Sequence, residues 1–193
     1  PNGAPTQAVI VPIPSGNWKE PVRPAARAAE AALAAAGVRV RLDAREEFTP
    51  GWKFSEYEMR GVPLRIEIGP RDVKAGQAVV VRRDTRAKQA VPLPALASRV
   101  PGLLAEVQAE LLGQARAFLE ANIRDAADYG SFKETLENQR GFVRAPWCGD
   151  ETCEDRIKTE TMATIRVIPL DEAEARPSGP CVCCGREGKA VAY

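Results

Sequence analysis

The chain has 193 residues, 45 % of them hydrophobic and 27 % charged, so it is long enough to bury one or two modest globular cores. No apolar run approaches the roughly 20 residues that span a bilayer, and no basic segment followed by an apolar one marks a signal peptide, so we exclude a membrane protein and expect a cytoplasmic one. The net charge of +1 excludes a protein that holds nucleic acid by bulk electrostatics, so any such binding must be local.

The first part of the chain alternates short apolar runs with stretches of helical periodicity. The first run is ended by Pro12 and Pro14, and the first helix stops at Gly37, a plausible C-cap residue. The order β-α-β-α-β-α-β predicts an α/β fold in which helices cover a mixed sheet. We predict strands at Gln7–Ile13, Val38–Asp43, Pro63–Gly69 and Gln77–Arg83, and helices at Pro21–Ala36 and Phe54–Arg60.

The later part of the chain is predicted to begin with a long helix over Pro101–Asp128. Its apolar face should pack on the sheet, and it carries Leu104, Val107, Leu111, Phe118 and Leu119. Ser131 and Glu134 have the spacing of a capping box for a shorter helix that ends near Gly141. One apolar strand is expected at Thr164–Ile168. We place one domain at residues 1–110 and a small α+β extension at residues 111–193.

All five cysteines lie in this extension, in the pattern C-x4-C, 27 residues, then CVCCG. Four thiolates presented by two short knuckles suit tetrahedral Zn2+, and a closed four-sulfur site leaves no open position for water. The spacing predicts a structural zinc site made by Cys148, Cys153, Cys181 and Cys184, with Cys183 as a spare thiol. A pairing of Cys181 with Cys183, or disulfides in a secreted protein, are the alternatives.

Aromatic, acidic and arginine residues are concentrated in Pro50–Asp72 and Gln77–Lys88, around the ends of two predicted strands. Exposed bases are read by stacking and by hydrogen bonds to their edges. A carboxylate such as Glu56 or Glu67 can accept from guanine, and Arg65 or Arg82 can donate to a base or a phosphate. The alternative is that these charges form the solvated face of alternating strands.

Arginine outnumbers lysine by 20 to 7, and histidine is absent. Guanidinium groups favour planar bidentate contacts, whereas the lack of histidine removes the usual general base near neutral pH. No glycine-rich phosphate loop is present, and Glu56 and Glu58 point to different faces of their helix. We therefore expect no catalysis from this chain alone. Because the first residue is Pro1 and not Met, we expect a piece of a longer protein.

The runs GWKFSEYEMRGVPLRIEIGPRD and VVVRRD closely resemble the anticodon-binding domain of prolyl-tRNA synthetases. The segment Asn122–Ala126 and the cysteine-bearing tail resemble the C-terminal extension of the archaeal and eukaryotic-like form of that family. The resemblance implies a five-stranded mixed sheet with flanking helices that holds the anticodon of proline tRNA and reads its two guanines. It also implies a four-cysteine zinc site in the extension.

The resemblance further implies that ATP and Mg2+ act only in a class II catalytic domain outside this chain, and that the full-length parent is a homodimer. Tyr57 stands where relatives often have Trp, and the lead-in to Tyr193 departs from the family, so Tyr193 is given no catalytic role. The expected anticodon contacts are Glu56, Arg65 and Glu67, with Arg71, Arg82 and Arg83 for phosphate or base oxygen. The alternative is a zinc-stabilised protein interaction module without anticodon selectivity, and a free-standing carboxylate enzyme is the third possibility.

Overall fold

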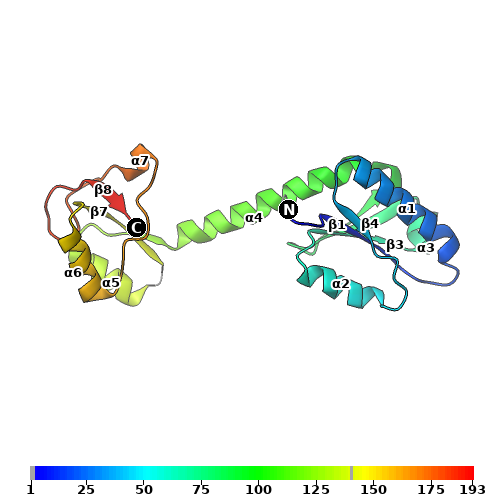
Figure 1. Cartoon of the computed structure of the whole chain (residues 1–193), viewed down its shortest axis with the longest axis horizontal. Helices are drawn as coiled ribbons and strands as arrows, with labels where there is room; N and C mark the ends of the chain where they lie inside the picture. The colour runs from blue at the N-terminus through cyan, green and yellow to red at the C-terminus, as the bar shows by residue number, and fades with distance from the viewer. Residues whose placement is uncertain (1–2, 140) are drawn as a thin grey trace. The chain divides into compact units, whose positions relative to one another are not determined.

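The first part of the computed structural model, which describes residues 3–139 and 141–193, is built on a five-stranded sheet of order β2-β1-β3-β4-β5 (Figure 1). Three parallel strands, β1 (Ala8–Pro12), β2 (Val40–Leu42) and β3 (Leu64–Ile68), are followed by two antiparallel ones, β4 (Gln77–Arg82) and β5 (Lys88–Pro92). The predicted mixed sheet is confirmed. The strand β5 was missed by pattern reasoning, because its edge position leaves only Val91 buried.

Helices cover both faces of this sheet, in the order that the sequence predicts. One face buries Ile10, Ile66 and Val80 in register against α1 (Lys19–Ala35), α3 (Pro70–Lys74) and the start of α4 (Leu96–Ala121). The other face carries Val9 and Val11 and is partly covered by α2 (Pro50–Met59). The alternation of Arg65 and Glu67 with buried neighbours along β3 is confirmed, so these two polar side chains lie on the α2 face.

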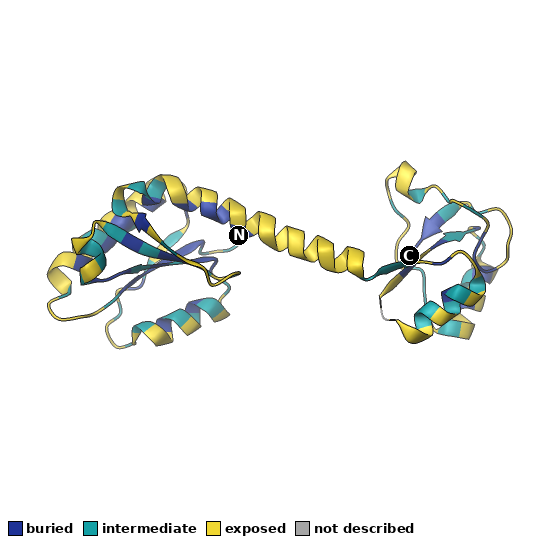
Figure 2. Cartoon of the chain, turned by 180° about the vertical axis from the view of Figure 1, so that it is seen from behind, coloured by how far each residue is buried: buried dark blue, intermediate teal, exposed yellow. Residues whose placement is uncertain are grey.

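The long helix α4 differs from its prediction at both ends. It follows a 3-10 turn, η1 (Leu93–Ala95), begins five residues before Pro101, and ends at Ala121 because the chain then enters strand β6 (Ile123–Asp125). Its buried residues all lie before position 108, whereas Leu111, Phe118 and Leu119 are exposed. The expectation that the whole apolar face packs on the sheet is therefore wrong, and Figure 2 shows the exposed second half.

The chain divides into two compact units within α4, the first ending at Gln114 and the second beginning at Ala115. The second unit has a three-stranded sheet of order β6-β7-β8, with β7 at Phe142–Trp147 and β8 at Ala190–Ala192. Its helices are α5 (Tyr129–Asn138), α6 (Glu151–Thr161) and α7 (Glu172–Ala175). The boundary proposed after residue 110 also lies within α4.

Two local predictions in the second unit are wrong. Asp128, not Ser131, caps α5, since the Asp128 side chain accepts from the Ser131 backbone N–H at 2.9 Å. Residues 164–168 form no named strand, although this segment makes two backbone hydrogen bonds with Tyr193, at 2.7 and 3.0 Å. In the described residues, no helix is both long and apolar enough to cross a membrane.

Candidate nucleic-acid interface and metal centre

Arg65 lies at the centre of the α2 face of the first sheet. Its Nε donates to Glu67 Oε1 at 2.9 Å and its Nη1 to Glu58 Oε1 at 3.0 Å, and its guanidinium lies 3.9 Å from the ring centroid of Phe54. The side chain is only 12 % exposed. The structure thus brings Arg65 and Glu67 together as a pair whose charges already compensate each other.

Glu56 lies on α2 and accepts a 2.6 Å hydrogen bond from Arg60 Nε one helical turn later. Trp52 lies one turn earlier on the same face of α2, because residues four apart on a helix are neighbours, and it is 42 % exposed. This face therefore offers a carboxylate beside an exposed aromatic ring.

The three remaining arginines do not join one patch. Arg82 points to the opposite face of the sheet, where it donates to Asp84 Oδ2 at 2.7 Å and to Glu106 of α4 at 3.3 Å. The hydrogen bond from Arg82 holds the pKa of the Asp84 carboxyl below its usual value. Arg83 Nε donates to the Glu58 backbone oxygen at 2.9 Å, and Arg71 is exposed at the start of α3.

Sequence reasoning assigned no role to an aromatic cluster at the start of α2. The rings of Phe48 and Trp52 stack with centroids 3.9 Å apart, and the Arg45 guanidinium lies 4.8 and 5.5 Å from them. Arg45 is fixed by a bidentate pair with Asp43, at 2.9 and 2.7 Å. The sequence did contain a signal for this cluster, because one aromatic residue precedes and another follows Thr49-Pro50. These two residues are the N-cap and the first residue of α2.

Asp43 is buried at the end of β2 and also binds two residues of α2. It accepts from Tyr57 at 3.1 Å and lies 3.6 Å from Lys53 Nζ, which is itself buried. Burial raises the pKa of Asp43, but the hydrogen bonds from Arg45, with Lys53 and Tyr57, outweigh it and lower the pKa to about 2. This network fixes α2 on the sheet.

The four cysteines predicted to bind metal come together in the second unit. The sulfur atoms of Cys148, Cys153, Cys181 and Cys184 all lie within 4.8 Å of one another. Cys148 Sγ is 3.7 Å from Cys153 Sγ and 3.8 Å from Cys184 Sγ. A tetrahedron with zinc–sulfur bonds of about 2.3 Å has sulfur atoms roughly 3.8 Å apart. The donor set fits a bound metal ion, and a four-sulfur set favours zinc.

Local backbone geometry presents these sulfurs. Cys148 follows β7, and Cys153 lies in the first turn of α6, which Asp150 caps. In each knuckle a glycine directly after a cysteine has a left-handed backbone, with φ of 79° at Gly149 and 75° at Gly185. A hydrogen bond of 2.9 Å from the Val182 N–H to the Pro146 oxygen joins the second knuckle to β7.

Cys183 is buried but lies outside this cluster. Burial raises the pKa of its thiol, which agrees with a spare neutral cysteine. All five cysteines are free in this structure, so the disulfides considered as an alternative to the metal site are not formed.

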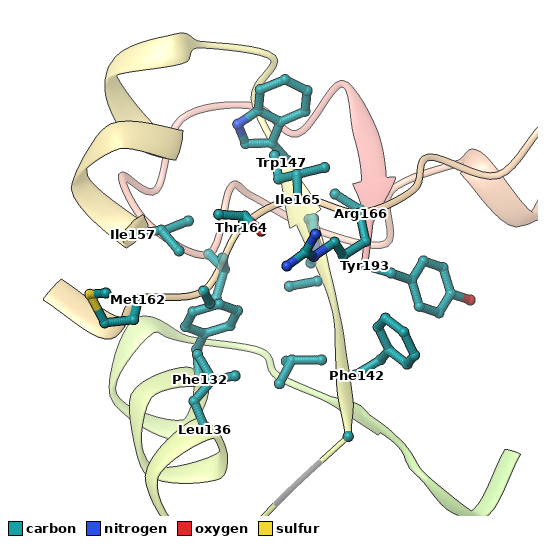
Figure 3. Close-up of a pocket in the computed structure, with 17 residues that line it drawn as sticks. Phe132, Leu136, Phe142, Trp147, Ile157, Met162, Thr164, Ile165, Arg166 and Tyr193 are labelled. Atoms are coloured by element: carbon teal, nitrogen blue, oxygen red, sulfur yellow. The ribbon is translucent and has the colours of Figure 1, made fainter. Parts of the chain in front are cut away.

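The second unit also contains an apolar pocket of about 240 Å³ beside β7 (Figure 3). Figure 3 shows Phe132 and Ile157 at one side of the pocket and Tyr193 at the other. Among the described residues, no acid, lysine or cysteine lines it. The pocket offers packing surface and no acid–base pair.

Comparison with known proteins gives two family matches. The anticodon binding domain family matches residues 7–103, and the family described as prolyl-tRNA synthetase, C-terminal, matches residues 129–193. The first match alone covers half of the chain. Together they cover the sheet of the first unit and the cysteine-bearing unit.

Individual relatives agree with these matches. A proline–tRNA ligase of Rubrobacter xylanophilus is 50 % identical over 193 residues, all of this chain and 40 % of the relative. One of Cenarchaeum symbiosum is 47 % identical over 192 residues, 99 % of this chain and 39 % of the relative.

A solved structure also resembles the chain. It is a prolyl-tRNA synthetase of Cryptosporidium parvum complexed with halofuginone and AMPPNP, and it matches with a TM-score of 0.88 and 36 % identity over 98 % of this chain and 40 % of that one. The chain thus spans about two fifths of the length of the relatives it matches. It belongs to the anticodon-binding domain family, and it carries that domain followed by the C-terminal domain of prolyl-tRNA synthetase.

Proposed function

We propose that this chain is the tRNA-binding part of a proline–tRNA ligase and that its first unit reads the anticodon of proline tRNA. A class II catalytic domain outside the chain would attach proline with ATP and Mg2+, and the chain alone would form no prolyl-adenylate. The observation that carries the anticodon role is the pairing of the exposed Trp52 ring with the Glu56 carboxylate on α2. The Arg65–Glu67 pair of β3 lies at the other flank of the same helix, where Arg65 contacts Phe54 and Glu58.

Each of these groups suits one part of an anticodon nucleotide. The exposed Trp52 ring offers a stacking plane for a base, and the Arg45 guanidinium lies 4.8 and 5.5 Å from the two stacked rings of Phe48 and Trp52. The Glu56 carboxylate can accept from the Watson–Crick edge of guanine once Arg60 is displaced. Arg65 can donate to a guanine edge while Glu67 keeps its guanidinium plane in place.

Three arginines, Arg71, Arg82 and Arg83, are proposed as phosphate contacts. They should contribute unequally to the affinity. Arg71 is exposed and can reach a phosphate directly. Arg82 would first have to leave Asp84 and Glu106, which makes it the weakest of the proposed contacts. Because Arg82 is already paired with two carboxylates and Arg83 donates to a backbone oxygen, the salt dependence of binding should be shallow for an arginine-rich protein.

The second unit is proposed to be held together by structural Zn2+ at Cys148, Cys153, Cys181 and Cys184. Bound zinc would supply folding free energy and no chemistry, because all four ligands come from the protein. The exposed Leu111, Phe118 and Leu119 of α4 fit contact with the catalytic domain, whose surface would cover them. We further propose that the parent enzyme is a cytoplasmic homodimer.

The test is binding of the whole chain to proline tRNA transcripts with the natural anticodon and with each guanine replaced, at one fixed salt concentration. Glu56→Gln and Glu67→Gln should each remove about 1–3 kcal/mol of the discrimination between the two transcripts. Glu20→Gln is the matched control, because Glu20 is exposed on α1, which covers the sheet face opposite α2, and it accepts a hydrogen bond from Asn17 Nδ2 at 3.1 Å.

Three outcomes are informative. Equal discrimination by all three variants would show that the carboxylate assignments are wrong. Equal binding of both transcripts by the unaltered chain would instead reject anticodon reading and favour a zinc-stabilised interaction module. Prolyl-adenylate formed by the chain alone would reject the separation of binding from catalysis.

A further inference from the structure

The side chain of Arg186 points at the sulfur atoms of the four-cysteine cluster. Arg186 Nε donates to Cys184 Sγ at 3.3 Å, and its Nη2 lies 3.9 Å from both Cys148 Sγ and Cys153 Sγ. Arg186 follows Gly185, whose left-handed backbone turns the chain back over the second knuckle. One guanidinium therefore contacts three of the four proposed ligands, from both knuckles.

The charges near the cluster give this contact its importance. A zinc ion with four thiolates carries about two negative charges in excess. Asp150, Glu151 and Glu187 line the same open surface as Cys148 and Arg186, so acidic groups lie at this end of the site. Like charges at close range raise the free energy of the loaded site. Arg186 brings the opposing charge to the sulfur atoms themselves.

Asp150 connects this arginine to the fold. Its Oδ1 accepts from the Thr152 backbone N–H at 3.0 Å and so caps the helix that carries Cys153. Its other oxygen, Oδ2, accepts from Arg186 Nη2. The carboxylate thus orients the arginine and the ligand-bearing helix at once, as outer-shell carboxylates do at many metal sites.

Lys189 provides an internal comparison. It lines the same open surface as Cys148, Asp150 and Arg186. Within the described residues, its ammonium makes no hydrogen bond to a sulfur atom, so its charge acts only at long range. A neutral substitution at Lys189 removes the same charge from the same surface without touching the sulfurs.

We propose that Arg186, oriented by Asp150, is a positioning residue that neutralises the four-thiolate site and slows the loss of its metal. The proposal rests on the proposed zinc site. It assigns the arginine no part in tRNA binding. Arg186 is 59 % exposed, so its effect must weaken as salt screens it.

The experiment uses the full chain, purified with zinc, as four proteins: unaltered, Arg186→Gln, Arg186→Lys and Lys189→Gln. Zinc per chain is determined first, and the rate of zinc transfer to an excess of a chromogenic chelator is then measured at low and high salt. Loss of an outer-shell partner typically weakens metal binding about 10–100-fold. Arg186→Gln should release zinc faster by about that factor, Arg186→Lys by less, and Lys189→Gln at the unaltered rate.

The outcomes separate the two proposals. If the unaltered chain holds no zinc, the zinc site itself is wrong. If it holds zinc and Arg186→Gln releases it within about twofold of the Lys189→Gln rate, the role of Arg186 is rejected. A release rate that rises for Arg186→Gln equally at all salt concentrations also rejects it, because packing and not charge would then be responsible.

If Arg186→Gln does not fold, the variant Asp150→Asn tests the role of Arg186 instead. Asparagine is as good an N-cap as aspartate, so α6 keeps its cap while the partner charge of Arg186 is lost. We expect an intermediate release rate for this variant. A rate equal to that of the unaltered chain would overturn the orienting role of Asp150.

Discussion

The first unit encloses a continuous apolar layer between its sheet and α1, α3 and α4, with Ile10, Ile66 and Leu103 fully buried. In the second unit, four of the ten residues in the buried cluster are cysteines, and the sheet has only three short strands. Small cores rarely stabilise a fold without a metal or another cross-link. The difference indicates that the first unit reaches order by burial of apolar surface, whereas the second, with its small core and four clustered cysteines, would reach it by the metal ligation proposed above.

Loss of a proposed metal ligand should give the largest difference in stability between the two units. Structural zinc sites supply roughly 10 kcal/mol or more of apparent binding free energy, so Cys181→Ser should unfold residues 115–193 and leave the first unit folded. Limited proteolysis followed by mass spectrometry measures this. Cys183→Ser is the control, and its cysteine lies outside the cluster. Equal protease resistance of Cys181→Ser and Cys183→Ser would contradict the dependence of the second unit on the metal.

A cavity in the core of the first sheet should destabilise the first unit and leave the second unit unchanged. Ile66 is completely buried at the centre of the sheet, so Ile66→Ala should lower the free energy of unfolding of the first unit by about 2–5 kcal/mol. Denaturant unfolding followed by fluorescence in a Trp147→Phe background reports on this unit, because Trp18 and Trp52 then remain. Met59→Ala, at an 86 % exposed site, should change little. A change in zinc content would contradict the independence of the units.

Acid should weaken the first unit through Asp43. Its folded pKa of about 2 lies below the unfolded value, so its stabilisation is complete above pH 4 and is lost as the pH falls toward 2. The lost stability amounts to roughly 2 kcal/mol. Asp43→Asn should flatten this part of the pH profile, measured with the same fluorescence signal. An unchanged slope below pH 4 would mean that other carboxyl groups control acid unfolding.

The smallest expected change is stabilising. Gly113 lies inside α4 with open space around its Cβ position, so Gly113→Ala should raise helix stability by about 0.5–1 kcal/mol. Gly76 is the matched contrast, because its φ of +67° strains any side chain there, and Gly76→Ala should destabilise. The midpoint temperatures of thermal unfolding of the two variants, compared with that of the unaltered chain, measure both changes. A loss of stability in Gly113→Ala would mean that α4 needs a flexible point.

The sheet of the first unit was predictable because its strands are apolar runs bounded by proline and glycine. The edge strand β5 was not, since KQAVP buries only Val91 and lacks a strong alternation. In the second unit, β7 reads FVRAPW with a proline inside it, and β8 has three residues, so neither gives a periodic signal. Their pairing depends on contacts distant in sequence.

The candidate sites divide in the same way. The four cysteines that come together were predicted from the spacing of two knuckles and a glycine, although spacing alone left a pairing of Cys181 with Cys183 open. The expected anticodon contacts could not be grouped from sequence, because Arg82, at the end of β4, bonds Glu106 of α4, whereas Arg83, just after the strand, bonds Glu58 of α2 on the other side of the sheet. Arg186 carried no signal either, since its importance arises only from its distance to three sulfur atoms.

The position of the two cysteine pairs along the chain has a consequence for biosynthesis. The sheet of the first unit is complete at Pro92, whereas the proposed metal site lacks its fourth ligand until Cys184 has been made. During translation, domains generally fold as units from the N-terminal side. On the proposed function, the second unit would stay unfolded, with its thiols accessible, while the first unit is already folded. If the proposed site takes up zinc, zinc supply would control folding of the second unit and leave that of the first unchanged.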